Sequence, residues 1–241
     1  MTREAESVGD VLGITATTAF VARSSTSGST EACGRRVWAK RVLDVSLGAI
    51  ALVLSAPLLV LAAIAIRISS HGPVLFRQRR IGQAGKPFTM WKFRSMRVTN
   101  DDSTHRAYVR AMLLGGEQLP SGRLGLHKLD DDRVTAVGRL LRRTSVDELP
   151  QLFNVLRGDM SLVGPRPALP WEVELFSPVD RVRFDVKPGI TGLWQVSGRS
   201  RLTMRQALEL DRAYVTQQSL LLDLKILLKT LPVVLVARDA A

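Results

Sequence analysis

The longest apolar stretch of the chain runs from Val45 to Ile66, a segment that contains no charged residue. It holds about 22 residues, which as a helix would be about 33 Å long and would cross the hydrocarbon core of a bilayer. A soluble core helix that is apolar on every face would need a far larger protein around it. The pattern therefore predicts a membrane helix.

Pro57 lies in the middle of this stretch, and its ring and missing N–H predict a kink or a break in the helix. The hydroxyl of Ser55 can bond a backbone group that the break leaves without a partner. Basic charges dominate both flanks: no acid stands between Gly34 and Leu43, where Arg35, Arg36, Lys40 and Arg41 lie, and none from Arg67 to Arg97, where eight Lys or Arg lie. Because the positive-inside rule places both flanks in the cytoplasm, the sequence predicts a re-entrant membrane helix over residues 35–69, broken at Pro57. A kinked helix that crosses the membrane once is the alternative.

The segments on either side of the membrane helix differ in character. Residues 1–34 are rich in Ser, Thr, Ala and Gly and have no apolar period, which is typical of a disordered tail. Residues 70–241 predict a globular domain of mainly α-helices with short β segments, an α+β fold. Helices are predicted at 134–143, from Ser145 or Asp147 to Gly158, at 203–217 and at 220–231, with a pair of short strands within 186–196. The last helix fits the membrane interface and the protein core equally well.

The chain is strongly basic: 34 Lys and Arg against 22 Asp and Glu give a formal net charge of +12. Such an excess indicates an anionic partner, which can be nucleic acid, a membrane surface or a phosphorylated small molecule. Cys33 is the single cysteine, so neither an internal disulfide nor a cysteine-based zinc cluster can form, and a reducing compartment is expected. Only 5% of the residues are aromatic, which is unlike most surfaces that stack nucleic-acid bases.

Two adjacent carboxylates, Asp147 and Glu148, stand at the predicted start of a helix. In one register Ser145 caps the helix and Glu148 completes a capping box, so that both residues are purely structural. In the other register Asp147 is the N-cap and Pro150 falls at the third helical position, where no N–H is needed. This second register places both carboxylates at the positive end of the helix dipole, where an ionised Asp147 can act as a nucleophile or bind a cation. The segment by itself leaves both interpretations open.

Arg166 stands between two prolines in the sequence Gly164-Pro165-Arg166-Pro167. A stiff backbone lowers the entropy lost when a guanidinium grips an anion, and arginine can hold phosphate oxygens through two parallel hydrogen bonds. By itself the motif also fits a solvated loop arginine. The chain has no GxxxxGKS/T, GxGxxG or HExxH motif, which argues against a standard nucleotide-hydrolysing or dinucleotide enzyme.

A series of short motifs follows in order along the chain. They are Lys40-Arg41-Val42-Leu43-Asp44, Gly72-Pro73-Val74-Leu75-Phe76-Arg77-Gln78, Lys92-Phe93-Arg94-Ser95-Met96, Asp147-Glu148-Leu149-Pro150-Gln151-Leu152, Gly164-Pro165-Arg166-Pro167 and Lys187-Pro188-Gly189-Ile190-Thr191-Gly192-Leu193-Trp194-Gln195-Val196. Together they resemble the bacterial sugar transferases that act on polyprenyl phosphate. The resemblance covers the chain from about Arg36 to the C-terminus, and the ordered set is specific where any one motif would be weak.

The resemblance implies a monotopic phosphoglycosyl transferase of the bacterial inner membrane, in its minimal form, with the active site on the cytoplasmic face. Such an enzyme transfers a sugar 1-phosphate from a UDP-sugar to undecaprenyl phosphate and releases UMP, which starts the assembly of a polysaccharide or glycoconjugate. The resemblance further implies that Asp147 is the nucleophile of a phosphoaspartyl-sugar intermediate, that Glu148 is its partner, and that Mg²⁺ is the cofactor, held by these two carboxylates. It also implies that Arg166 binds phosphate, with Lys92 and Arg94 in the substrate site.

Other expectations complete this interpretation. The family often has Ser-Pro at the helix break, whereas here Ala56 separates Ser55 from Pro57. No nucleic acid is expected beyond the nucleotide of the sugar donor, and a homodimer is left open. The rival hypothesis, suggested by the charge of +12, is a membrane-tethered basic module that binds nucleic acid or anionic lipid.

Overall fold

The computed structural model describes residues 28–96, 110, 134–198 and 202–235. The chain divides into two compact units, residues 1–40 and 41–241. The described helices are α2 (Gly28–Ser69), α4 (Ala136–Arg143), α5 (Gln151–Arg157), α6 (Pro170–Leu175), α7 (Leu193–Ser197), α8 (Met204–Gln217) and α9 (Leu220–Leu235), with the 3₁₀ turns η1 (Gln83–Gly85), η2 (Val146–Glu148) and η3 (Asp180–Asp185). The strands are β1 (Leu75–Ile81), β2 (Pro87–Phe93), β3 (Ser161–Val163) and β4 (Gly189–Thr191). The predicted fold class, mainly α with short β segments, is confirmed.

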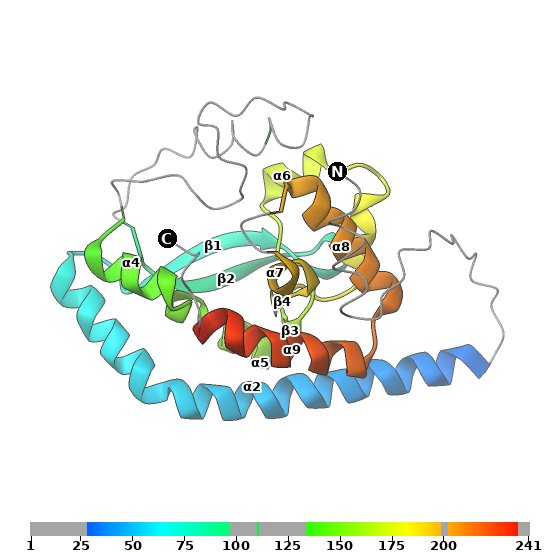
Figure 1. Cartoon of the computed structure of the whole chain (residues 1–241), viewed down its shortest axis with the longest axis horizontal. Helices are drawn as coiled ribbons and strands as arrows, with labels where there is room; N and C mark the ends of the chain where they lie inside the picture. The colour runs from blue at the N-terminus through cyan, green and yellow to red at the C-terminus, as the bar shows by residue number, and fades with distance from the viewer. Residues whose placement is uncertain (1–27, 97–109, 111–133, 199–201, 236–241) are drawn as a thin grey trace. The chain divides into compact units, whose positions relative to one another are not determined.

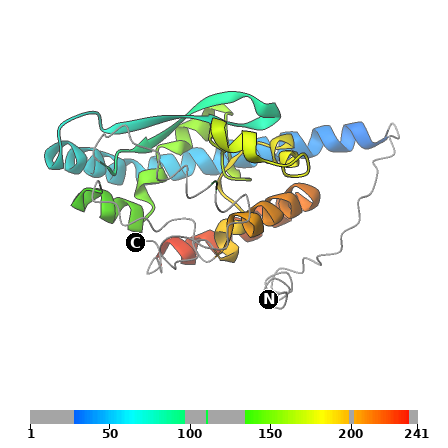
Figure 2. The same ribbon diagram turned by 90° about the horizontal axis from the view of Figure 1, so that it is seen from above.

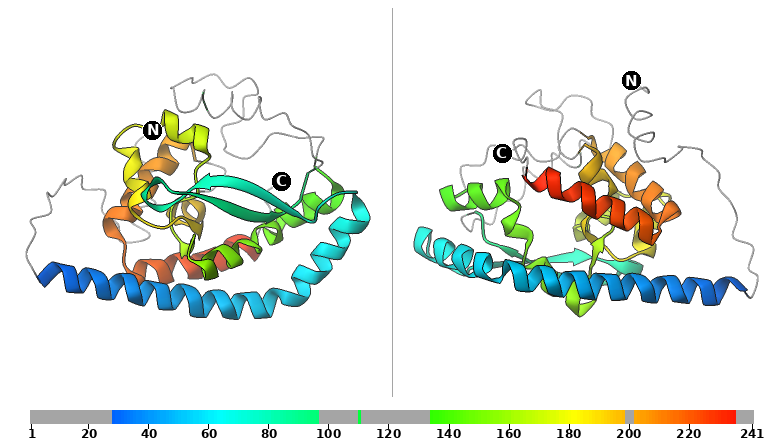
Figure 3. Two further views of the ribbon diagram at one scale, coloured as in Figure 1. Left: turned by 180° about the vertical axis from the view of Figure 1, so that it is seen from behind. Right: turned by 60° about the horizontal axis from the view of Figure 1, so that its bottom comes forward.

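Helix α2 carries the long apolar stretch and is continuous through Pro57. Figure 1 and Figure 3 show α2 bent between two straighter parts, so the helix bends but does not break. The hydroxyl of Ser55 donates to the carbonyl of Leu52, 3.3 Å away, a local contact of the kind that bends helices. Because α2 begins at Gly28, the predicted tail boundary at residue 34 is too late, and residues 1–27 lie outside the described part of the chain.

The beginning of the apolar segment of α2 is fixed to α5 and β3. The guanidinium of Arg41 donates to the carbonyls of Val155 and its neighbour at the end of α5, over 2.6 and 2.8 Å. These carbonyls belong to the last turn of a helix, which leaves them without helical partners. The carboxylate of Asp44, which is buried, accepts from the hydroxyl of Ser161 at 2.9 Å.

The end of the apolar segment packs against other elements of the same globular unit. Ala62 and Ile66 of α2 are buried in a hydrophobic cluster with Phe93 of β2 and Leu141 of α4. Both ends of the segment are therefore attached to one body.

Between these two attachments α2 exposes its large apolar side chains. Val53, Leu54 and Leu61 are 72%, 76% and 64% exposed. Over residues 34–69 the helix is long and apolar enough to cross a membrane, and only 11% of its most apolar window is buried. A core helix of a soluble protein would be mostly covered, so this middle part needs another apolar surrounding.

Strands β1 and β2 form an antiparallel hairpin, with Leu75 paired to Phe93 and Ile81 paired to Pro87. Figure 2 shows the hairpin as a long ribbon. Its turn contains Ala84 and Gly85, both with positive φ, and such backbone conformations reverse a chain tightly. The hairpin brings Lys92 and Arg80 into the same body as the loops that follow α5.

Strands β3 and β4 form a short parallel pair, with Ser161 opposite Gly189 and Val163 opposite Thr191. The predicted strand pair within residues 186–196 is therefore wrong, because β4 pairs with β3 and the chain then enters α7. Alternation over so few residues cannot separate a strand from a short buried helix. Helix α7 buries Leu193 and Trp194.

Helices α8 and α9 close the globular unit. Thr203 caps α8 through a capping box with Gln206, which confirms the helix predicted at 203–217. Helix α9 buries Leu222 and Ile226 on one face. Its other face is exposed at Leu221, Leu224 and Leu228. Packing on the core is therefore confirmed for one face of α9, and a place of the other face at the membrane interface stays a prediction.

Candidate active site

Asp147 and Glu148 lie in the 3₁₀ turn η2 between α4 and α5, not in a regular helix. Ser145 has a left-handed backbone with φ of 57° and makes no side-chain cap bond. Helix α5 has Pro150 at its N-cap, so both predicted cap registers are wrong. A proline fits the start of a helix because no helical partner exists there for an N–H. The two carboxylates therefore precede α5 by about one turn.

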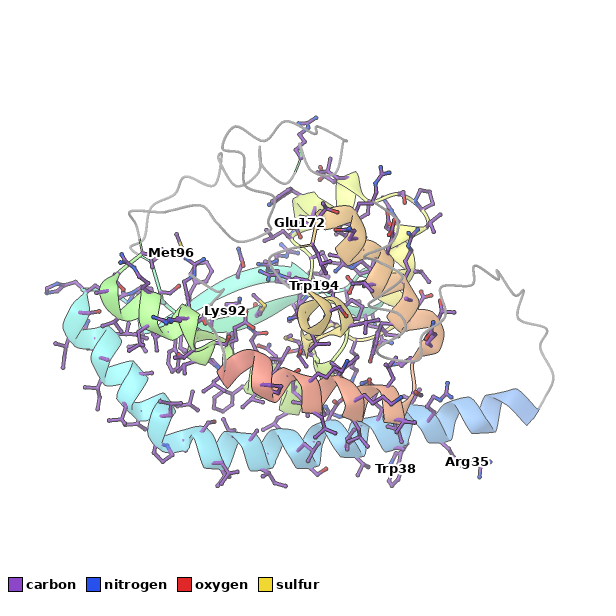
Figure 4. All side chains as sticks on the ribbon, viewed as in Figure 1. Arg35, Trp38, Lys92, Met96, Glu172 and Trp194 are labelled. Atoms are coloured by element: carbon purple, nitrogen blue, oxygen red, sulfur yellow. The ribbon has the colours of Figure 1, made fainter. Side chains whose placement is uncertain are left out.

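Asn154 fixes α5 onto the β1–β2 hairpin. It is 1% exposed, accepts from the N–H of Trp91 at 3.1 Å and donates to the carbonyl of Thr89 at 2.8 Å. These two hydrogen bonds place Lys92, the residue after Trp91, opposite the acidic turn. The ammonium of Lys92, a residue labelled in Figure 4, lies 2.8 Å from a carboxylate oxygen of Glu148. The structure therefore brings together three of the predicted site residues, Lys92, Asp147 and Glu148.

The electrostatics of the turn are set by crowding of negative charge in a buried place. Burial raises the pKa of Asp147 to about 6, and the carboxylate of Glu148 adds to the rise. The positive charges of Lys92 and Arg142 oppose it. Asp147 is therefore ionised at neutral pH but poorly solvated, which suits a nucleophile. Sequence reasoning missed Arg142, whose signal was its place in the last turn of a helix that ends just before the acidic turn.

Arg166 is partly buried in the loop between β3 and α6. It acts electrostatically on Arg80, which is buried, and so does Glu148. Burial lowers the pKa of Arg80 to about 10, and the positive charge of Arg166 is the second cause. The charges of both the acidic turn and the arginine loop therefore act on Arg80.

Arg94 binds the backbone of the chain segment that follows α2. Its terminal nitrogens donate to the carbonyl of Ser70 at 2.7 Å and to the carbonyl of His71 at 3.0 Å. A Cβ at Gly72, where φ is 122°, would come within 2.2 Å of the same guanidinium. Arg94 is 5% exposed and committed to the chain that leaves α2. These contacts give Arg94 an anchoring role, and its predicted part in substrate binding stays a prediction.

The carboxylate pair fits a magnesium ion. No group of three or more His, Cys, Asp or Glu that could hold a metal occurs among the described residues. Mg²⁺, however, commonly binds through one or two carboxylates together with substrate phosphates and waters. Burial and then the charge of Glu148 raise the pKa of Asp147, and a cation held by these two carboxylates would compensate their negative charge.

Comparison with known proteins identifies the class. The bacterial sugar transferase family matches residues 35–237, and the chain belongs to that family. It is 45% identical over 209 residues to the UDP-glucose:undecaprenyl-phosphate glucose-1-phosphate transferase of Caulobacter vibrioides, a match that covers 83% of this chain and 71% of the relative. It is 40% identical over 202 residues to the exopolysaccharide production protein ExoY of Sinorhizobium fredii, covering 83% of this chain and 87% of the relative.

A third relative is longer. The UDP-glucose:undecaprenyl-phosphate glucose-1-phosphate transferase of Escherichia coli is 40% identical over 199 residues, and the match covers 79% of this chain but 39% of the relative. The region that the family matches, residues 35–237, contains the acidic turn, the arginine loop and most of α2. Family membership thus supports the interpretation of these motifs as parts of a transferase and leaves the rival basic binding module without support.

Proposed function

We propose that this chain transfers a sugar 1-phosphate from a UDP-sugar to undecaprenyl phosphate and releases UMP, as the first membrane step of polysaccharide or glycoconjugate assembly. The observation that carries the proposal is the buried Asp147 next to Glu148, whose carboxylate lies beside Lys92, in a chain whose relatives are named for this transfer. The substrates are both anionic, in agreement with the net charge of +12.

In the proposed first step a carboxylate oxygen of Asp147 attacks the phosphorus that carries the sugar. The new bond is an acyl phosphate linkage from Asp147 to this phosphorus, and the bond that breaks joins the phosphorus to the bridging oxygen of the diphosphate. The bridging oxygen leaves with UMP. Partial desolvation makes the carboxylate a better nucleophile than one in water.

In the second step an oxygen of undecaprenyl phosphate attacks the same phosphorus. The bond to Asp147 breaks, and the product is a diphosphate that joins the lipid to the sugar. One site can serve both substrates in turn because the covalent intermediate separates their visits. No net proton is needed between the steps, since an ionised carboxylate enters and leaves the cycle.

The side chains of this site have different tasks in handling the negatively charged phosphates. Asp147 and Glu148 would hold Mg²⁺, which when bound neutralises charge on the diphosphate. Lys92 orients Glu148 through their 2.8 Å contact. Arg166, in the loop between β3 and α6, would bind phosphate oxygens.

We further propose that α2 enters and leaves the bilayer on the cytoplasmic face of the inner membrane. Arg41 and Asp44 attach the beginning of the apolar segment to the globular unit, and Ala62 and Ile66 attach its end to the same unit. A straight crossing would place these attachments on opposite sides of the membrane. The exposed side chains between them would then contact lipid.

The test of the activity is UMP release from a panel of UDP-sugars with undecaprenyl phosphate and Mg²⁺. We expect release with at least one sugar, and retention of radiolabelled sugar phosphate on the protein when the lipid is withheld. No release with any sugar under these conditions would refute the proposed function.

The test of the topology uses thiol labelling from the periplasmic side. A membrane-impermeant reagent should label neither Cys33 nor a cysteine introduced as Ser69→Cys in a Cys33→Ser background, and both should react once the membrane is opened. Ser69 is exposed, so its cysteine is within reach of the reagent. Labelling of one position from outside would establish a single crossing.

A further inference from the structure

The backbone around Arg166 is tied down at four successive carbonyls, each by a different donor. The carbonyls of Pro165, Arg166, Pro167 and Ala168 accept, in order, from the N–H of Gly189 at 2.9 Å, the guanidinium of Arg183 at 2.7 Å, the guanidinium of Arg80 at 2.9 Å and the N–H of Ile81 at 2.9 Å. Flanking prolines already restrict this loop. The two middle bonds come from buried arginine side chains. Burial of these charges costs desolvation free energy.

Arg183 is supplied with a counter-charge from another element. Its terminal nitrogen lies 2.8 Å from the carboxylate of Asp211 on α8, and the two side chains are 7% and 3% exposed. The guanidinium also lies over the ring of Phe176, 5.0 Å from its centroid. The second carboxylate oxygen of Asp211 has no hydrogen-bond partner among the described residues.

Stability alone is a weak reason for this buried pair. A buried ion pair can often be replaced by apolar residues of similar volume without loss of stability, because the desolvation cost offsets the attraction. Arg80 is held in a similar way, by the side-chain oxygen of Gln78, over 3.0 and 2.6 Å. Both buried arginines thus end on the backbone of the same loop.

We propose that Arg183, held by Asp211, and Arg80, held by Gln78, are positioning residues that fix Arg166 for binding the diphosphate of the sugar donor. This inference rests on the proposed function of Arg166. Neither arginine has to touch the substrate. Each holds a carbonyl next to or within Arg166, so that the guanidinium of Arg166 starts from one fixed backbone position.

The charges around the loop support the same role. Arg166 and Arg183 both lower the pKa of Arg80 through their positive charge, after burial as the main cause. The carboxylates of Glu172 and Glu148 act on Arg80 in the opposite direction. A diphosphate bound by Arg166 would add a further counter-charge beside these arginines.

The decisive variant replaces the pair by an apolar one, Arg183→Met with Asp211→Leu. It removes the bond to the carbonyl of Arg166 and leaves no unpaired buried charge, so the fold should be kept. We expect kcat/KM for the UDP-sugar to fall about 10- to 100-fold, and the Kd for UDP to rise, because a small misplacement of a binding group has effects of this size. The matched control is Arg181→Met, an exposed arginine on the same turn η3, which should leave both values unchanged.

A double-mutant cycle separates positioning from general damage. If the pair acts through Arg166, the apolar exchange should cost little further activity in an Arg166→Lys background. Full additivity would show that the pair acts elsewhere and would overturn the inference, as would wild-type kinetics and UDP affinity in the folded apolar variant. If circular dichroism shows that the apolar variant does not fold, Arg183→Lys is judged by the same criteria, since it keeps the charge beside Asp211 and shortens the donor.

Failure of the proposed function has a different signature. A wild-type protein that releases no UMP with any UDP-sugar refutes the function, whatever the variants do. A wild-type protein that is active, with variants that match it, refutes only the positioning role.

Discussion

Asp147 and Asp211 are buried aspartates in two regions of the molecule, and burial raises the pKa of each to about 6. Their neighbours differ. Asp147 stands next to a second carboxylate, Glu148, whose charge adds to the rise, whereas Asp211 faces Arg183 at 2.8 Å, whose charge opposes it. A raised pKa therefore does not by itself identify a reactive carboxylate. The carboxylate in the proposed reacting turn has a neighbour of like charge, whereas the carboxylate that holds Arg183 has a neighbour of opposite charge.

The arginines divide in the same way. Arg94 uses its terminal nitrogens on the carbonyls of Ser70 and His71, so it anchors the chain at the end of α2. Arg166 is held through its own carbonyl, by Arg183. The guanidinium of Arg94 thus holds backbone, whereas the backbone of Arg166 is itself held by another arginine.

The largest effect is expected from Asp147→Asn. The amide has the shape of the carboxylate but is a poor nucleophile toward phosphorus, so turnover should fall by about 10⁴-fold or more. UMP release and covalent labelling should both be lost. The matched variant Asp211→Asn should keep covalent labelling at a reduced level, and equal losses in the two variants would erase the distinction between the regions.

Arg166→Lys should have the next largest effect. Lysine keeps the positive charge but lacks the fork that holds two phosphate oxygens, so kcat/KM should fall about 10- to 100-fold while the unfolding temperature stays unchanged. Steady-state UMP release and thermal unfolding measure the two quantities. Wild-type kinetics in this variant would favour a solvated loop arginine.

Arg94→Gln should show the opposite pattern. Loss of a charged donor to two carbonyls should lower the free energy of unfolding by about 2–3 kcal/mol, with kcat/KM of the folded fraction unchanged. Denaturant unfolding in detergent measures the first quantity, with the exposed Arg79→Gln as control. A large rise in KM with normal stability would return Arg94 to the substrate site.

The smallest effect concerns stability and pH at Asp147. Because its folded-state pKa is raised from 3.8 to about 6, ionisation destabilises the folded state above pH 6, and this loss disappears as the pH falls from 6 toward 4. Asp147→Asn should therefore unfold at a higher temperature than the wild type at pH 8, by about 2–4 °C for each kcal/mol gained. The difference should vanish near pH 4.

The matched control for this measurement is Glu174→Gln, since Glu174 is exposed. It should show no such pH-dependent difference. A gain for Asp147→Asn that is equal at pH 4 and pH 8 would mean that burial does not disfavour the Asp147 carboxylate.

Several features of this protein are determined by short stretches of its sequence. The uncharged run from Val45 to Ile66 requires an apolar surrounding, and Pro57 disturbs its helix because its N–H is missing. Thr203 caps α8 through contacts within one turn. The acidic turn and the Pro-flanked Arg166 could be recognised as candidate site residues for the same reason, because each motif consists of adjacent residues.

Only the tertiary structure decided which of the many charges act together. Lys92 meets Glu148, and Arg183 meets Asp211, across long separations in the chain. Arg94 meets the carbonyls of Ser70 and His71 at the end of α2, and no local pattern marks these partners. Composition and spacing give every basic side chain the same charge and reach, and only packing of distant elements fixes which carboxylate or carbonyl each one meets.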